Sequence, residues 1–214
     1  FLGNGGAFPG PPAGIAVDVW RRWLIDQDKA LVASNNYDTR NIVAGNSASD
    51  NIGVFGNAGY KINSNTEVYA TIGGSTRDGL ASGFSRNPNS WNQQPVVTGG
   101  GRLYTNGFLP QIATKINDYS ILAGIKTSTN NGWNFDLSNT YGENSLAFTI
   151  QNSGNASLAA TANPQTKFEA GGIKFKQNTI NLDISKKLDI EDGNFLNIAF
   201  GGELRNENYS IRAG

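Results

Sequence analysis

The stretch WNFDLSNTY, residues 133–141, decides the fold class because it alternates between two kinds of side chain. Its apolar residues all stand at odd positions: Trp133, Phe135, Leu137 and Tyr141. Its even positions are polar: Asn134, Asp136, Ser138 and Thr140. Successive side chains of a β-strand point to opposite faces of the sheet. The stretch therefore predicts a strand with one apolar and one polar face.

The same alternation recurs on both sides of this strand. It marks residues 51–62, where Phe55 is the exception, and then residues 66–77 and 119–126. A further hairpin is expected to pair residues 173–188 with residues 195–211.

One arm of that hairpin changes parity. Ile173 and Phe175 stand at odd positions, whereas the apolar residues from Ile180 onward stand at even ones. A β-bulge inserts one residue and thereby shifts the parity of the side chains. We therefore expect a bulge, or a switch of faces on the loop side, near Gln177.

The connections between strands alternate in length. Outer-membrane barrels combine short periplasmic turns with long extracellular loops, whereas compact soluble domains rarely contain very long loops. Short turns are expected at residues 63–65, 128–132 and 189–194, and long connections at about residues 78–117 and 146–172. We therefore predict an all-β fold, an antiparallel transmembrane β-barrel segment of long hairpins that is incomplete within this chain.

Two regions are expected along the chain. Residues 42–214 carry the barrel hairpins, with short periplasmic turns and long extracellular loops. Residues 1–41 form a loop-rich start, in which residues 15–20 alternate briefly and residues 21–34 fit either a strand or a short helix.

The composition excludes several classes of function. Lys+Arg and Asp+Glu number 17 each, so no excess of positive charge favours nucleic acid. Cysteine and histidine are absent, which removes thiolate chemistry and the commonest metal ligand. No apolar run approaches the roughly 18 residues of a membrane-spanning helix. We expect no enzyme, no catalytic residue, no metal site and no cofactor.

Aromatic residues near the strand ends suggest a membrane boundary. Amphipathic rings favour the headgroup level of a bilayer. The candidates for this interface are Tyr60, Tyr119, Trp133, Tyr141 and Phe195. The alternative is that these rings pack across an ordinary soluble sheet.

The first long connection is rich in aromatic and basic side chains. Such side chains either contact an incoming ligand or pack the loops themselves. The candidate ligand contacts are Phe84, Arg86, Trp91, Arg102, Tyr104 and Phe108.

Several stretches resemble one family, the TonB-dependent outer-membrane receptors. The resemblance covers about residues 42–214 and follows the chain in order. The stretches that carry it are EVYA at 67–70, STRDG at 75–79, SGFSR at 82–86, YTNGFLPQI at 104–112, GWNFDLS at 132–138, NSGNASL at 152–158 and AFGGELRNENY at 199–209.

This resemblance implies a place in the bacterial outer membrane and a function in transport. Members of the family form a 22-stranded barrel around an N-terminal plug and import scarce nutrients such as ferric chelates or cobalamin. The implied partners are the lipid bilayer, a small nutrient ligand and, through the plug, an inner-membrane energising complex. This chain departs from the pattern because it shows neither plug nor TonB box and only six to eight strands. We therefore expect further sequence, or a second chain, to supply the plug and the remaining strands.

Two other functions fit the pattern less well. One is a small eight-stranded outer-membrane barrel or adhesin, which would close within this chain. The other is a soluble β-sandwich that binds carbohydrate, in which the apolar faces would pack against each other in water.

Overall fold

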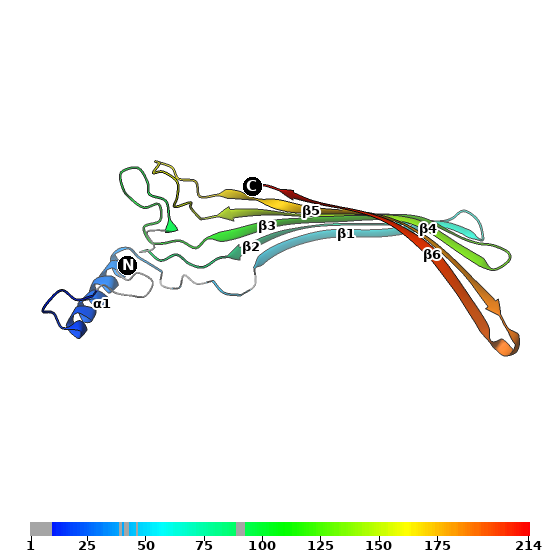
Figure 1. The fold of residues 1–214 in the computed structure, drawn as a ribbon, viewed down its shortest axis with the longest axis horizontal. Helices are drawn as coiled ribbons and strands as arrows, with labels where there is room; N and C mark the ends of the chain where they lie inside the picture. Colours follow the sequence, from blue (N-terminus) through cyan, green and yellow to red (C-terminus); the bar gives the residue numbers. More distant parts are fainter. Residues whose placement is uncertain (1–9, 39, 41–42, 46, 89–92) are drawn as a thin grey trace. The chain divides into compact units, whose positions relative to one another are not determined.

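The described residues form six β-strands and one α-helix, an all-β architecture. The computed structural model describes residues 10–38, 40, 43–45, 47–88 and 93–214. The elements are α1 (Val17–Ser34), β1 (Ala48–Lys61), β2 (Thr66–Ser82), β3 (Gln111–Ser128), β4 (Trp133–Gln151), β5 (Phe168–Asp189), the short 3-10 helix η2 (Glu191–Gly193) and β6 (Phe195–Arg212) (Figure 1).

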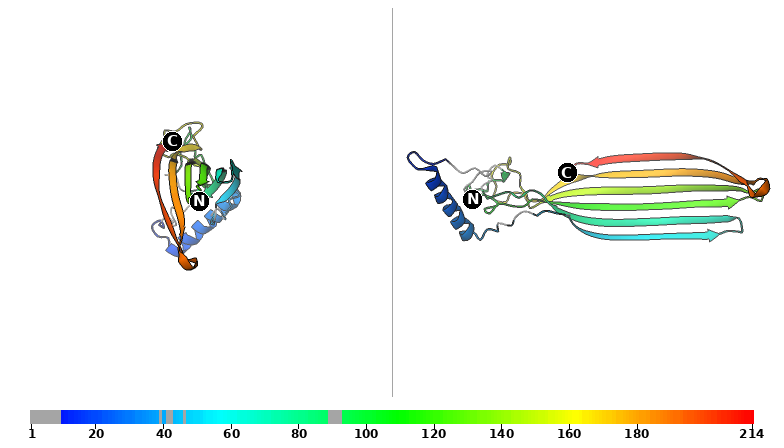
Figure 2. Two further views of the ribbon diagram at one scale, coloured as in Figure 1. Left: turned by 90° about the vertical axis from the view of Figure 1, so that its right-hand side faces the viewer. Right: turned by 90° about the horizontal axis from the view of Figure 1, so that it is seen from below.

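The strands form one sheet in which each strand lies beside its neighbour in the chain. The order is β1-β2-β3-β4-β5-β6, so β1 and β6 are the two outer strands (Figure 2). The sheet does not close on itself among the described residues. This confirms the predicted all-β hairpins, while the described part of the chain forms an open sheet.

The β5–β6 ladder runs without interruption from Gly172 opposite Arg212 to Asp189 opposite Phe195. A bulge near Gln177 would break this register, so the ladder excludes the first of the two expected alternatives and agrees with the second, a switch of faces. Apolar side chains change from one face of the strand to the other. Paired residues share a face, so Ile173 lies with Ile211 on the face opposite to Ile180.

The strands extend further than the alternation indicated. β2 continues to Ser82, β3 begins at Gln111, β4 continues to Gln151 and β5 begins at Phe168. Backbone pairing needs no alternation of side chains, so it persists where the polarity pattern has faded. The long connections are therefore shorter than expected, residues 83–110 and 152–167.

Helix α1 settles the ambiguous start of the chain. Residues 21–33 are mostly good helix formers, and the i,i+4 pair Asp18–Arg22 joins at 2.8 Å. The helix ends before Asn36, which adopts a positive φ of 48° that asparagine tolerates. Among the described residues, no helix has the length and apolarity needed to cross a membrane.

By contacts, the chain divides into two compact units. We call Ser49–Asp78, Thr114–Phe148 and Gly171–Gly214 the sheet unit. We call Phe1–Ala48, Gly79–Ala113 and Thr149–Ala170 the loop unit.

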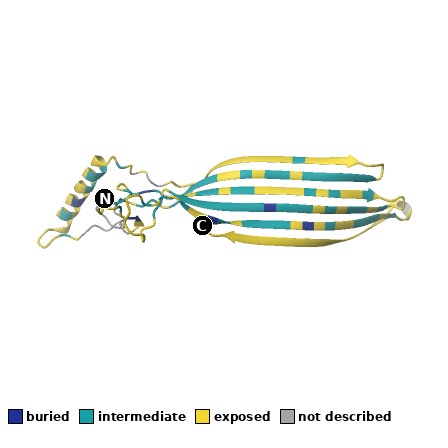
Figure 3. Cartoon of the chain, turned by 90° about the horizontal axis from the view of Figure 1, so that it is seen from above, coloured by how far each residue is buried: buried dark blue, intermediate teal, exposed yellow. Residues whose placement is uncertain are grey.

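Hydrophobic burial differs sharply between the two units. The buried hydrophobic side chains of the described residues are Leu24 and Phe108, and both belong to the loop unit. In the sheet unit most side chains are exposed or intermediate (Figure 3). A sheet in water normally buries one face against a second layer of structure. The described part of the sheet unit has no such second layer.

Candidate functional site

Contacts between side chains show which residues of β4, β5 and β6 share a face. Trp133 meets Phe200 edge-on, with ring centroids 6.2 Å apart. Phe200 pairs with Ile184 in the ladder, so odd positions of β4 lie with even positions of β5 and β6.

Side-chain contacts also show which positions of β1, β2 and β3 share a face with β4. Tyr119 of β3 meets Tyr141 of β4 at 6.2 Å, and the hydroxyls of Thr66 and Thr127 lie 2.9 Å apart. On the opposite face, Arg77 donates to Asn51 at 2.9 Å, which sets the parity of β1. Even positions of β1 and β2 therefore share a face with odd positions of β3 and β4.

This face, which we call the apolar face, runs across all six strands. Its large side chains are well exposed, for example Val54 at 78%, Ile52 at 69% and Leu204 at 69%. Continuous apolar patches of this extent are rare on soluble proteins. The residues of the apolar face are Ile52, Val54, Ala58, Tyr60, Val68, Ala70, Ile72, Tyr119, Ile121, Ala123, Ile125, Trp133, Phe135, Leu137, Tyr141, Ile180, Leu182, Ile184, Leu188, Leu196, Ile198, Phe200 and Leu204.

Four of the five aromatic candidates lie at the two ends of the apolar face. Tyr60 and Trp133 stand next to the short turns, and Lys186 lies over the Trp133 ring at 5.3 Å. Tyr119 and Tyr141 form their tilted pair further along the strands.

Phe195, the fifth candidate, lies on the other face of the sheet. It pairs with Asp189, and Lys187 lies over its ring at 4.6 Å. All three residues have odd parity and therefore lie on the face opposite to Leu196. The sequence placed Phe195 near a strand end, but its parity is opposite to that of Leu196, and the register agrees with that parity.

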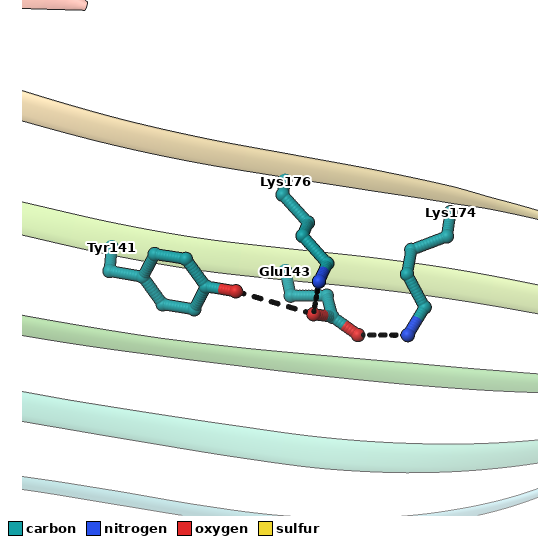
Figure 4. Close-up of polar contacts among 4 residues, drawn as sticks. All are labelled: Tyr141, Glu143, Lys174 and Lys176. Atoms are coloured by element: carbon teal, nitrogen blue, oxygen red, sulfur yellow. Dashed lines mark hydrogen bonds and ion pairs between the residues drawn. The ribbon is translucent and has the colours of Figure 1, made fainter. Parts of the chain in front are cut away.

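A charged cluster follows Tyr141 on the apolar face (Figure 4). Glu143 is 8% exposed and lies 2.7 Å from the Lys174 ammonium and 3.5 Å from that of Lys176. The Tyr141 hydroxyl donates to the same carboxylate at 3.3 Å. Burying a carboxylate is costly unless it is paired, and here two cations and a hydroxyl compensate it.

Sequence reasoning missed this cluster, although parity could have found it. Lys174 and Lys176 have the even parity of Ile180, and Glu143 has the odd parity of Tyr141. Extending the alternation beyond its last apolar residue would have placed all three on one face.

The opposite face, which we call the polar face, carries its own network. Tyr69 donates its hydroxyl proton to Asp136 at 2.6 Å. Lys126 lies 3.5 Å from Glu67 and 5.6 Å from the centroid of the Tyr69 ring. These contacts join β2, β3 and β4 through side chains that favour an aqueous surrounding.

A hollow of about 640 Å³ lies on the polar face. Its floor consists largely of glycine and serine from β1 to β4, and Phe55 and Phe175 are part of its lining. Its lining residues are Gly53, Val54, Phe55, Gly73, Gly74, Ser75, Asp118, Tyr119, Ser120, Thr140, Gly142, Glu143, Asn144, Phe175 and Gln177.

In the loop unit, the two long connections pack against each other. Tyr104 stacks on Phe108 with centroids 4.4 Å apart, and its hydroxyl donates to the Ser153 carbonyl at 2.9 Å. Its backbone N–H donates to Gln94 at 2.8 Å. Burial raises the pKa of the Tyr104 hydroxyl. Val97 and Thr161 form a parallel bridge between the same connections.

These contacts show which of the six candidate ligand contacts pack the loops. Phe108 is 8% exposed and Tyr104 is engaged at both ring and hydroxyl, so both pack the loops. Arg102 donates to the Pro88 carbonyl and is half-buried. Trp91 lies outside the described residues.

Two candidates remain accessible. Phe84 is 86% exposed, and Arg86 is half-buried beside it, with its guanidinium 3.4 Å from the Phe84 carbonyl. Arg86 also lines a hollow of about 330 Å³ together with Gln93 and Ser153.

The described residues contain no group of three or more carboxylate, histidine or cysteine side chains that could hold a metal ion. No family model, curated protein or solved structure matches the chain. The two faces of the sheet and the loop unit are therefore the features that bear on function.

Proposed function

We propose that this chain is part of the barrel wall of an outer-membrane, TonB-dependent nutrient transporter. The observation that supports it most directly is the exposed apolar face of a single-layered sheet whose other face is polar. In water such a face would need a second layer. In a bilayer, acyl chains cover the outer face of a barrel, and the polar face lines the interior.

The dimensions of the apolar face fit a bilayer. Trp133 and Tyr141 are eight positions apart on β4. That is about 27 Å at ~3.4 Å per residue, and roughly 20 Å across the membrane for a strand tilted by about 40°. The apolar band of known barrels is about 25 Å tall.

The open edges require further strands to complete the wall. Unpaired strand edges are not tolerated in lipid, because their backbone groups would lack hydrogen-bond partners. The described sheet has six strands and two free edges, so further strands are needed to close a barrel. Further strands and a plug, supplied by the same or another chain, would complete the transporter.

The long connections would then face the outside and meet the nutrient, a ferric chelate, cobalamin or a similar compound. Phe84 and Arg86 are the candidate contacts that the loop packing leaves accessible. Uptake of labelled ferric chelates and cobalamin by cells with and without the energising complex tests this transport function. Uptake that does not depend on the complex would contradict it.

A pair of neighbouring substitutions tests the membrane-facing surface. Leu182→Arg places a charge on the apolar face, whereas Asn181→Arg places the same charge on the polar face of the same strand. We expect Leu182→Arg to lower the free energy of unfolding from phosphatidylcholine vesicles by about 2–4 kcal/mol. Asn181→Arg should change it by less than about 1 kcal/mol.

Urea titration monitored by tryptophan fluorescence measures both effects. If the two substitutions lowered the free energy of unfolding equally, the assignment of the apolar and polar faces would be wrong. Stable monomeric folding of the chain in buffer without detergent or vesicles would contradict the membrane location itself.

A further inference from the structure

The cluster of Glu143, Lys174 and Lys176 stands at one border of the apolar face. It lies toward the ends of β4 and β5 that lead into their long connection. On β4 the cluster follows Tyr141, and on β5 it precedes Ile180 by a few residues. Charges at these positions would be costly among acyl chains but suit the headgroup level of a bilayer.

The geometry leaves the two ammonium groups side by side and partly open. Glu143 is almost fully buried, while the Lys174 and Lys176 side chains are 44% and 42% exposed. An ammonium group has three N–H donors. The shared carboxylate accepts from each lysine on one side (Figure 4), and both side chains are exposed enough for a further acceptor to reach them.

The same border carries an excess of positive charge. Lys115 lies 3.6 Å from Asp78, and Arg212 lies opposite Gly172 on the face of Lys174. Together with the cluster this makes four cationic side chains and two carboxylates. An anionic group would complement this border.

The apolar face beyond the cluster offers a place for hydrocarbon. A shallow groove of about 640 Å³ crosses the face, because small alanine side chains lie between larger ones. The side chains of the apolar face among its lining residues are Ala58, Tyr60, Val68, Ala70, Ala123, Ile125, Leu137 and Ile180. An occupant suited to both features has an anionic head and an apolar tail.

We propose that Lys174 and Lys176, held together by Glu143, bind the phosphate headgroup of a membrane lipid whose acyl chains lie along the apolar face. The proposal depends on the membrane location given under the proposed function. It adds a specific lipid site to a wall that otherwise only contacts the bilayer.

Lipid retention by the full chain in detergent micelles tests the site. The chain is incubated with equal amounts of phosphatidic acid and phosphatidylcholine, and native mass spectrometry counts the lipids that remain bound. We expect the unaltered chain to retain phosphatidic acid preferentially. Lys174→Gln with Lys176→Gln should lower that preference about tenfold or more, because each lysine near an anionic surface contributes favourably.

Two further variants separate binding from folding. Removing both lysines alone leaves Glu143 as an unpaired buried carboxylate, which destabilises the sheet. Adding Glu143→Gln removes this charge, so the triple variant should fold yet still lose the preference. Lys126→Gln is the matched control, because Lys126 also pairs with a glutamate, at 3.5 Å, but on the polar face. Its preference should not change.

Three results would overturn the proposal: no preference for phosphatidic acid, the same loss in Lys126→Gln, or displacement of the lipid by equimolar inorganic phosphate. Insertion into pure phosphatidylcholine vesicles is measured in parallel. Insertion of both the unaltered chain and the triple variant without any lipid preference would reject this site alone. Failure of both to insert when the strands that complete the barrel are supplied would reject the proposed function and the lipid site with it.

Discussion

At the scale of single residues, Gly124 shows how the polar face is built. A side-chain Cβ at this position would overlap the Tyr69 ring. That ring crosses β3, and its hydroxyl donates to Asp136 on β4. Gly73 also lies on the polar face, yet a Cβ there would meet its neighbours at 3.5–3.6 Å, an ordinary contact. Only one of these two glycines is therefore required by packing.

We expect Gly124→Ala to destabilise the protein by about 1–3 kcal/mol relative to Gly73→Ala. The methyl group displaces the Tyr69 ring and weakens its hydrogen bond to Asp136. Urea unfolding from vesicles measures the difference. In a Tyr69→Ala background the two substitutions should have similar effects, and a persistent difference would show that the ring is not the cause.

At the scale of elements, the two long connections behave as one folded piece. Phe108 and Tyr104 form its centre, and hydrogen bonds from Asn152 to the Leu109 carbonyl at 2.7 Å and from Tyr104 to Ser153 tie the connections together. Phe84, in the same connection, is almost fully exposed. Of these two phenylalanines of one connection, Phe108 is therefore buried and Phe84 is exposed to solvent.

We expect Phe108→Ala to lower the free energy of opening of this loop cluster by about 3–5 kcal/mol, the usual cost of deleting a buried phenylalanine. Phe84→Ala should leave it almost unchanged, because that ring contacts mainly solvent. Hydrogen exchange of the Tyr104 amide, which donates to Gln94, is the measurement. Equal exchange rates in both variants would argue against the packing described for Phe108.

At the scale of the whole molecule, the outer strands β1 and β6 have edges whose backbone groups need hydrogen-bond partners. The outer edge of β6 leaves every second backbone N–H without a strand partner in the described sheet. Within a membrane these groups need hydrogen bonds.

We expect the outward amides of β6 to exchange as slowly as those of β4 when the protein is inserted in its native membrane. The reason is that a neighbouring strand must cover this edge. Hydrogen exchange with mass spectrometry compares the two strands. Rapid exchange along β6 in the membrane would contradict a closed wall.

Alternation within the sequence was sufficient to determine the strands, their apolar and polar sides and the short turns. The period of two records an environment that differs on the two faces, as at Trp133–Tyr141. Where that difference fades, as in residues 143–151, the pairing of strands continues without a sequence signal. The helix at Val17–Ser34 remained ambiguous for a similar reason, since its apolar residues fit two periods.

The tertiary structure alone decided which side chains meet. Pairing between strands placed Phe195 on the polar face, brought Glu143 to Lys174 and Lys176, and buried Phe108 while leaving Phe84 exposed. These facts depend on register and on contacts between distant segments. A local pattern of residues carries no record of either, because it describes one strand and not the neighbour against which that strand lies.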